Sequence, residues 1–223
     1  MKIIAYVHTD FPDKFGLPRQ SGLVPLAGRI EFEPPYGNPD AFRGLEGYSH
    51  IWVLWRFDGF EGDFAPTVRP PRLGGNRRMG VFATRSPHRP NPIGISVLRL
   101  LRVVEGPAGV TLLVSGVDMV DGTAVYDVKP YLPYVDSVPD ARGGFGAEHT
   151  EDHLAVSFAE GVEVPAEVAD TLRAVLSADP RPHYHADGRV YGMRYAGYEV
   201  RFVVEDATLT VLSIAADTTT PRA

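Results

Sequence analysis

Two arginines, a histidine and an asparagine lie within the ten residues Arg85–Gly94, whose sequence is RSPHRPNPIG. Pro87, Pro90 and Pro92 lack the N–H that a strand ladder requires, so the segment predicts a rigid, irregular loop between two strands. Rigid loops on a scaffold often carry binding residues, and guanidinium groups bind carboxylates and phosphates in a bidentate manner. The segment therefore indicates an anion-binding site, although a proline-stiffened barrel closure would use the same residues.

A second segment, Asp118–Tyr131, combines three carboxylates with one lysine. Asp121-Gly122 is a turn signal, and a carboxylate beside a turn could bind a ribose hydroxyl or a cationic group. Equally, Asp127 and Lys129 could form a structural pair, since residues two apart share one face of a strand. The residues alone leave both interpretations open.

Two further segments carry polar side chains next to predicted strands. Phe11–Gln20 is expected to be a loop after the first strand, with two cationic residues. In Gly44–Trp52, His50 enters a strand rich in aromatic residues. A lone histidine in that position favours a satisfied core residue over a catalytic one.

The elements that must position these segments are mainly strands. The predicted strands are Ile3–Val7, Tyr48–Phe57, Met79–Thr84, Ile95–Val104 and Val110–Val117. Residues 105–109 (EGPAG) predict a hairpin connection between the last two, and one short helical turn is expected near Pro39–Arg43. Several short strands with little helix favour a barrel or a sandwich.

A glycine-rich stretch at 139–152, PDARGGFGAEHTED, predicts an exposed linker to a second module. Pro165 is expected to open a helix, since proline is well tolerated in a first turn, and Asp179-Pro180 to end it. Apolar residues at helical spacing are Val168, Leu172, Val175 and Leu176. The expected strands, the last three forming an antiparallel meander, are Leu154–Ala159, Val190–Tyr195, Tyr198–Val204 and Leu209–Ile214.

The chain has 223 residues and a net charge of −6, which argues mildly against nucleic acid as a partner. The charge is unevenly placed, because no acidic residue occurs between Phe64 and Val104. The arginines of this block are Arg69, Arg72, Arg77, Arg78, Arg85, Arg89, Arg99 and Arg102. Such a block can bind a polyanion locally, although the arginines could equally be solvated around a barrel.

Several classes of site are excluded or disfavoured by what the sequence lacks. There is no cysteine, which excludes disulfides, thiolate metal sites and a cysteine nucleophile. No apolar run approaches the roughly 20 residues that cross a bilayer, and the amino terminus lacks a signal-peptide core. We therefore expect a cytoplasmic protein with no membrane partner. No G-x-G-x-x-G motif or P-loop occurs, so a nucleotide-like cofactor would have to be held in another way.

A metal-dependent hydrolase is one alternative. His149 and His153 stand four residues apart, with Glu151 and Asp152 between them. On a helix this spacing would place both imidazoles on one face. The segment follows a glycine-rich linker, has little helical character and lacks a convincing third ligand, so no metal site is predicted.

The unusual strings extend over nearly the whole chain. RSPHRPNPIG and DGTAVYDVKPY (121–131) are accompanied by RPPRLGGN (69–76) and DPRPHY (179–184). Together they resemble the TrmO family, bacterial transfer-RNA adenine N6-methyltransferases. The chain departs from the usual family pattern at Ala124, where proline is usual, and at His8-Thr9-Asp10, which replaces basic and small residues.

The resemblance implies a mainly β protein with two domains. Residues 1–142 would form a β-barrel that binds S-adenosylmethionine (SAM), and residues 152–217 a small α+β C-terminal domain. A homodimer is implied, with the cofactor close to the subunit interface. The implied substrate is the anticodon loop of tRNA, at adenosine 37, which already carries an N6-threonylcarbamoyl group and gains a methyl group on that nitrogen.

Residue roles are carried over from the matching motif positions. The implied cofactor-binding residues are Pro12, Asp13, Lys14, His50, Ile51, Arg85, Ile95, Asp121, Gly122, Thr123 and Ala124. The implied substrate and RNA contacts are Arg69, Arg72, Arg77, Arg78, Arg89, Asn91, Lys129, Arg181 and Tyr184.

A general base would assist the reaction, because the lone pair of the target nitrogen is delocalised into the ring and the carbamoyl group. The candidate bases are His50, Asp121, Asp127 and Tyr131, and spacing does not choose among them. The alternative function is a barrel that binds SAM or another small nucleotide without turnover.

Overall fold

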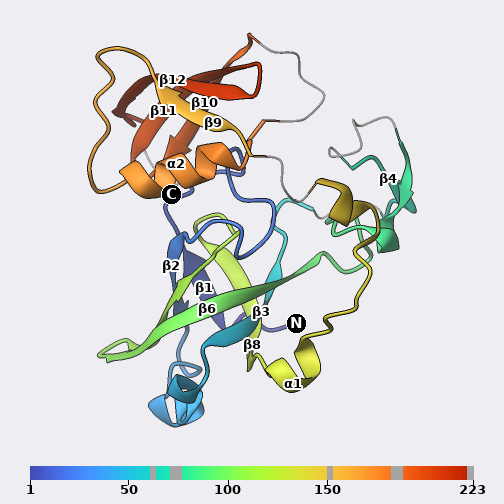
Figure 1. Cartoon of the computed structure of the whole chain (residues 1–223). Coiled ribbons are helices and arrows are strands. Elements are labelled where there is room, and N and C mark those ends of the chain that lie inside the picture. The colour runs from blue at the N-terminus through green and yellow to red at the C-terminus, as the bar shows by residue number, and fades with distance from the viewer. Residues whose placement is uncertain (61–63, 71–76, 150–152, 182–187, 220–223) are drawn as a thin grey trace.

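The computed structural model of the chain describes residues 1–60, 64–70, 77–149, 153–181 and 188–219. Its first module is a closed barrel of six antiparallel strands, in the order β1-β2-β7-β6-β3-β8 (Figure 1). The barrel strands are β1 (Ala5–His8), β2 (Ala27–Phe32), β3 (His50–Arg56), β6 (Ile93–Gly106), β7 (Gly109–Ser115) and β8 (Thr123–Pro130). The mainly β fold class with an N-terminal barrel is confirmed.

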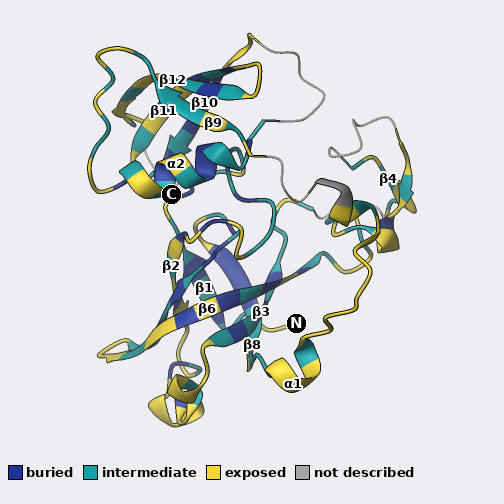
Figure 2. Cartoon of the chain, in the orientation of Figure 1, coloured by how far each residue is buried: buried dark blue, intermediate teal, exposed yellow. Residues whose placement is uncertain are grey.

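The barrel interior is filled by side chains that alternate along each strand. In β3, Ile51, Val53 and Trp55 are buried, and the residues between them are partly exposed. Leu112 and Val114 of β7 follow the same alternation. Successive side chains of a strand point to opposite faces, so this pattern turns one face into the core. The buried positions are dark blue along the strands in Figure 2.

Four of the five strands predicted for this module are confirmed, as β1, β3, β6 and β7, with ends shifted by one or two residues. The prediction for Met79–Thr84 is wrong beyond its first two residues. Only Met79–Gly80 (β5) is a strand, paired with β4 (Thr67–Val68). The next residues form a 3-10 turn (η4, Val81–Ala83), because the Thr84 N–H bonds back to the Val81 carbonyl at 3.1 Å.

Strands β2 and β8 were not predicted, because neither has a clear apolar alternation. In β2 only Ile30 is fully buried, and in β8 the apolar run is interrupted by Asp127 and Lys129. The hairpin between β6 and β7 is confirmed, as is the helical turn, which spans Pro39–Phe42 (η1). Further short helices among the described residues are η2 (Leu45–Gly47), α1 (Pro133–Asp136) and η5 (Gly144–His149).

The second module is a four-stranded sheet in the order β10-β11-β12-β9, with one helix packed beside it. Its elements are β9 (Ala155–Phe158), α2 (Ala169–Ser177), β10 (Val190–Tyr195), β11 (Tyr198–Glu205) and β12 (Thr208–Ala216). The predicted meander is confirmed, and β9 adds to it in parallel with β12. Helix α2 begins at Ala169 and not at Pro165, because residues 165–168 form a turn closed by the Val168 N–H. Its predicted apolar face is buried.

The two modules meet through the loop between β1 and β2, residues 9–26, which passes between the barrel and the C-terminal module in Figure 1. Phe11 lies against Tyr195 of β10, with ring centroids 4.8 Å apart. Phe15 stacks on Tyr191 at 5.9 Å. Buried aromatic pairs of this kind contribute about 0.5–1.5 kcal/mol beyond their burial, so the loop is fixed from the side of the second module.

Shape and charge fix the same loop further. Gly16 has φ +90°, and a Cβ there would lie 2.0 Å from the sulfur of Met193, so only glycine admits this contact. The Asp13 carboxylate forms an ion pair with the Arg194 guanidinium at 2.8 Å. Arg19 donates to the backbone carbonyls of Asp179 and Arg181, both at 2.9 Å. The loop is therefore part of both modules.

The predicted linker is exposed over residues 139–144 and contains the short helix η5. Residues 150–152 lie outside the described part of the chain. Among the described residues, no helix combines the length and apolar character needed to cross a membrane.

Candidate cofactor and substrate site

Three connections meet at one end of the barrel, which we call the loop rim: residues 9–26, residues 57–60 and 84–92 at the two ends of the longest connection, and residues 116–122. They join β1 to β2, β3 to β6 and β7 to β8. Because the strands are antiparallel, alternate connections return to the same end. The C-terminal module packs on the first of these loops, so the loop rim lies on its side of the barrel in Figure 1.

A cavity of about 290 Å³ opens among these loops and the adjoining strand ends. This size is near the lower end of ligand pockets, roughly 300–1,000 Å³. The cavity is lined by Arg19, Gln20, Trp55, Phe57, Thr84, Arg85, Arg89, Ile93, Gly94, Ile95 and Asp118. It brings together Arg85, Arg89 and Ile95 from the sequence-predicted site.

The two arginines of the proline-rich loop have different surroundings. Arg85 is exposed and donates to the side-chain carbonyl of Gln20. Arg89 is half-buried and donates to the backbone carbonyls of Val81 and Thr84, at 3.1 and 2.7 Å. Arg89 therefore stabilises the conformation of the loop, whereas Arg85 presents its charge to the cavity.

A chain of three side chains leads from the barrel core into the cavity. A Cβ at Gly94 would lie 2.2 Å from the indole of Trp55, so glycine makes room for that ring. The Trp55 Nε1–H donates to Ser96 Oγ at 3.0 Å. The Ser96 hydroxyl in turn donates to Asp118 Oδ1 at 2.7 Å. Asp118 is thus held by a hydrogen bond whose donor is itself fixed.

Burial raises the pKa of the Asp118 carboxyl from 3.8 to about 6. Hydrogen bonds from Ser96 and from the backbone N–H groups of Asp118 and Ser21 lower this pKa, as does the positive charge of Arg85. These lowering effects are smaller than the effect of burial, which disfavours the charged form. A carboxyl with this pKa is mainly ionised at neutral pH and is more basic than an ordinary aspartate.

Asp118 was missed as a site residue by the sequence prediction, which chose Asp121 and Asp127 from the same segment. A signal was present, because Asp118 stands between two apolar residues, Val117 and Met119, both of which are buried. A carboxylate between two core positions must be partly enclosed. Periodicity alone did not indicate that it would face a cavity.

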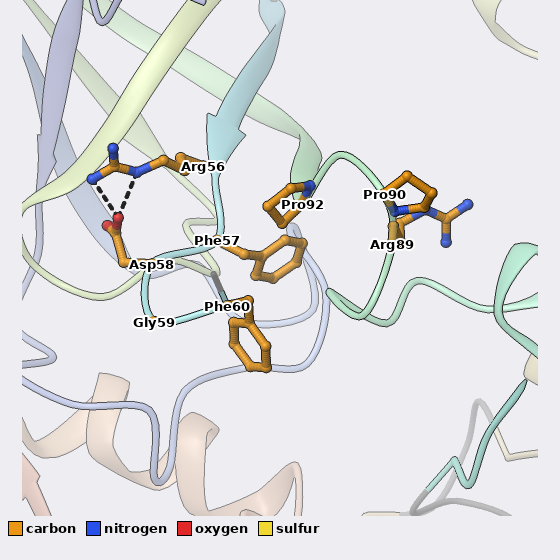
Figure 3. Close-up of a pocket in the computed structure, with 8 residues that line it drawn as sticks. All are labelled: Arg56, Phe57, Asp58, Gly59, Phe60, Arg89, Pro90 and Pro92. Atoms are coloured by element: carbon orange, nitrogen blue, oxygen red, sulfur yellow. Dashed lines mark hydrogen bonds and ion pairs between the residues drawn. The ribbon is translucent and has the colours of Figure 1, made fainter. Parts of the chain in front are cut away.

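A second cavity of about 280 Å³ adjoins the first through Phe57 and Arg89. Figure 3 shows the rings of Phe57, Phe60 and Pro92 close together, and the guanidinium of Arg89 turned away from them. Lys14 of the first loop donates to the Asp58 carbonyl at 3.2 Å and lies 4.4 Å from the Phe60 ring centroid. Lys14 therefore ties the first loop to this apolar surface.

The turn that precedes β8 is also at the loop rim. The Asp121 N–H donates to the Phe11 carbonyl at 2.8 Å, which joins this turn to the first loop. The Asp121 carboxylate is half-exposed and lies 3.1 Å from His8 Nδ1. Gly122 has φ +76°, as the turn requires. Thr123 and Ala124 are buried in the first residues of β8.

Other predicted site residues lie toward the opposite end of the barrel. His50 begins β3, bonds to Ser49 at 2.9 Å and lies edge-on to Tyr131. Ile51 is fully buried in the core. Trp55 follows His50 by five positions along β3, which corresponds to about 16 Å of strand. The structure therefore does not bring His50 into the cavity of the same chain.

The predicted pair on β8 is present, since Lys129 lies 3.0 Å from Asp127. Both side chains are exposed or half-exposed, and Lys129 pairs across the strands with Trp52. The alternative that these two residues form a structural pair is thereby supported by the geometry.

The remaining predicted RNA contacts are scattered. Arg69, Arg77, Arg78 and Asn91 are exposed along the connection between β3 and β6. Arg181 is half-buried, pairs with Asp179 at 3.1 Å and supplies the carbonyl bound by Arg19. Arg72 and Tyr184 fall outside the described residues, as do Glu151 and Asp152. In the described part of the chain, no three potential metal-ligating side chains form a group.

Two models of known protein families match this chain. A family model described as the tRNA-methyltransferase O N-terminal domain matches residues 6–137, and one described as the TrmO C-terminal domain matches residues 151–217. The chain belongs to the TrmO family. The resemblance found in the sequence strings is thus confirmed, with the TrmO barrel and C-terminal module in the predicted order.

Similar proteins span the same length. The chain is 43% identical over 224 residues to "tRNA (adenine(37)-N6)-methyltransferase" of Escherichia coli K12, covering 95% of each. A solved structure, "Crystal structure of TrmO from P. areuginosa", superposes with a TM-score of 0.77 at 37% identity, covering 96% of this chain and 95% of that one. A "Probable S-adenosyl-L-methionine-binding protein" of Archaeoglobus fulgidus is 36% identical over 148 residues, 66% of this chain and 38% of that protein.

Proposed function

We propose that this chain uses SAM to methylate N6 of adenosine 37 in tRNA, and that the adenosine already carries an N6-threonylcarbamoyl group. The observation that carries the reaction class is family membership over both modules, together with 43% identity across 95% of an E. coli tRNA (adenine(37)-N6)-methyltransferase. The threonylcarbamoyl group is the finer part of the proposal, and it comes from the motif resemblance.

The loop rim is the proposed cofactor site. SAM has a carboxylate, an amine, a ribose and a sulfonium cation, so its site needs both a cation and acceptors. Arg85 supplies an exposed guanidinium at the cavity, and Asp121 supplies a carboxylate within the same rim. Pro12, Asp13 and Lys14 lie on the first loop, which is fixed against the second module by Phe15 and Arg194. These residue types fit the polar ends of SAM.

The substrate would approach from the arginine-bearing connection between β3 and β6. Its exposed arginines suit phosphate contacts, which position an RNA without reading its sequence. The rings of Phe57, Phe60 and Pro92 in the second cavity offer surfaces against which an unstacked base could pack. An anticodon-loop base is single-stranded, so splaying it out costs little.

A homodimer in the cytoplasm completes the proposal, with domains at 1–142 and 152–217. His50 and Ile51 are proposed cofactor residues, yet they lie about 16 Å of strand away from the cavity. A two-fold dimer could resolve this by setting the His50 end of one chain beside the loop rim of its partner. The exposed side chains of Tyr134, Val135 and Val138 near that end are apolar surface that such a contact could cover.

The test is mass spectrometry of nucleosides from tRNA incubated with the purified protein and SAM. The tRNA comes from a strain that lacks the corresponding gene, and Arg85→Ala protein serves as the control. A gain of one methyl group on N6-threonylcarbamoyladenosine, absent with the variant, is the expected result. Methylation of adenosine 37 without the threonylcarbamoyl group would refute the finer substrate.

A SAM-binding barrel without turnover is the second candidate, favoured by the similarity to the Archaeoglobus protein named for SAM binding. It predicts binding of SAM in calorimetry with no methyl transfer to correctly modified tRNA. The same experiment therefore separates the two functions.

A further inference from the structure

We propose that Asp118 is the general base that takes the N6 proton of the target adenosine as the methyl group is transferred. The inference rests on the proposed site at the loop rim and deepens it by naming the proton acceptor. None of the bases suggested by the sequence has the same combination of enclosure, orientation and access to the cavity.

Orientation comes from the chain of hydrogen bonds behind the carboxylate. The Ser96 oxygen accepts the Trp55 Nε1–H at 3.0 Å, so its single hydrogen is directed to Asp118 Oδ1, at 2.7 Å. Trp55 cannot shift freely, because Gly94 of the neighbouring strand packs directly on its ring. Asp118 itself is part of the cavity lining. The carboxylate is therefore held on one side and accessible on the other.

Charge in the cavity agrees with this role. The charged side chains that line the cavity with Asp118 are Arg19, Arg85 and Arg89, all of them cations. Arg85 lowers the pKa of Asp118, while burial raises it to about 6. A general base is most effective when its pKa lies near the working pH, since it is then both ionised and basic. Asp118 meets this condition at neutral pH.

The reaction balances with no further reactant. The N6–CH3 bond forms as the S–CH3 bond of SAM breaks, and the electron pair of the broken bond stays on sulfur. The N6 proton passes to the Asp118 carboxylate, which becomes a neutral carboxylic acid. The positive sulfonium and the negative carboxylate are both neutralised. An enclosed site of low dielectric favours a step in which opposite charges disappear.

The candidates from the sequence have different surroundings. Asp121 is half-exposed and lies beside His8 and the backbone of Thr9. Asp127 pairs with Lys129 on the outside of the barrel. His50 and Tyr131 lie together at the far end of β3. Asp118 is enclosed by the cavity that also contains Arg85.

The experiment compares Asp118→Asn with wild type in single-turnover methylation of modified tRNA between pH 5 and 8.5. Wild-type rates are expected to rise with pH through an apparent pKa near 6 and then level off. The methylation rate of Asp118→Asn should be roughly 10²- to 10⁴-fold lower than that of wild type. Its Kd for SAM, measured by calorimetry, should stay within threefold of the wild-type value. Asp40→Asn, which removes an exposed carboxylate paired with Arg43, is the matched control and should behave as wild type.

Ser96→Ala keeps the carboxylate and provides a second measurement if Asp118→Asn folds poorly. Loss of this hydrogen bond removes an influence that lowers the pKa of Asp118. The inflection of the rate profile should therefore move to higher pH while the plateau rate is retained within tenfold. An unmoved inflection would overturn the assignment.

Two other results would also overturn it. Asp118→Asn could keep its rate within threefold, or it could weaken SAM binding in proportion to the lost rate, which would make Asp118 a cofactor ligand. If Arg85→Ala is inactive while Asp118→Asn is active, only the base assignment fails. If both variants methylate normally, the proposed site at the loop rim fails with it.

Discussion

The two ends of the barrel carry similar residue types but differ in how those residues are held. At the loop rim, Asp118 and Arg85 line a cavity, and the first loop is fixed by aromatic contacts to the second module. At the opposite end, Lys129 pairs with Asp127 and the carboxylate of Asp136 accepts from Trp52, both near the surface. Hydrogen bonds from the Leu132 N–H and from Trp52 lower the pKa of Asp136, whereas burial raises that of Asp118. An aspartate side chain is thus stabilised as an ion at the far end, at Asp136, and made more basic at the loop rim, at Asp118.

The difference follows from the loops. Loops held by a rigid scaffold often carry binding residues, and at the loop rim the first loop also packs against the second module. Residues of the first loop, with Thr84, Arg85 and Arg89 from the connection between β3 and β6, line the cavity around Asp118. The loop rim therefore differs from the opposite end of the barrel in the enclosure of its charged side chains, and not in their residue types.

If the loop rim binds SAM, Arg85→Ala should lower kcat/KM about 100-fold, since a hydrogen bond to a charged group contributes about 1.5–3 kcal/mol. Steady-state methylation of tRNA measures it. Arg102→Ala removes an exposed arginine of β6 that lies outside the loop rim. The kcat/KM of this variant should stay within twofold of the wild-type value. Equal losses in both variants would show that the arginines act only through overall charge.

Enclosure of Asp118 also predicts a stability effect. Its pKa is raised in the folded protein, so its contribution to stability is full below the unfolded pKa of about 3.8 and is lost as pH rises through about 6. Asp118→Asn removes the free-energy cost of ionising a buried carboxyl and should stabilise the protein by about 3 kcal/mol at pH 7.5, and by less than about 1 kcal/mol near pH 4. Urea unfolding at the two pH values measures it. A destabilised variant at pH 7.5 would mean that the carboxylate is held mainly by its hydrogen bonds.

The far end can be tested by mixing two variants. His50→Ala should lower methylation about tenfold if His50 completes the site of a partner chain in a two-fold dimer. Mixed with Arg85→Ala, it should then recover about a quarter of wild-type activity, because half of the dimers are mixed and one of their two sites is intact. Refolding the two proteins together and assaying the mixture measures this. No recovery, with both variants folded and dimeric, would place each site within one chain.

The smallest expected effect concerns the ion pair of the first loop. Arg194→Ala removes the contacts to Asp13 and to Asp217, whose side chains are partly exposed. Such pairs contribute about 0.2–1 kcal/mol, so the free energy of unfolding should fall by less than 1 kcal/mol. Phe15→Ala should cost about 2 kcal/mol or more, because the ring packs between the modules. Denaturant unfolding ranks the two, and a reversed order would mean that charge, and not packing, holds the loop.

The sequence by itself determined the family, the order of the modules and most of the strands. The proline-rich string and the Asp-Gly-Thr turn identify the family because their composition is unusual. Strands β3 and β6 follow from their runs of apolar and aromatic residues. The sequence did not predict β2 or β8, because their apolar patterns are weak. These two strands are stabilised by pairing with a neighbour on each side in the closed barrel.

Only the tertiary structure decided which residues share a site. Asp118 and Arg85 are 33 positions apart in sequence, and they meet because β6 and the connection to β8 reach the same rim. His50 and Trp55 are close in sequence, yet they lie toward opposite ends of the barrel because β3 is extended between them. Sequence patterns report local periodicity, while enclosure and its effect on a pKa depend on which loops cover a strand end. The position of Asp118 between two apolar residues therefore indicated burial in the sequence, but only the tertiary structure shows that its carboxylate lines a cavity.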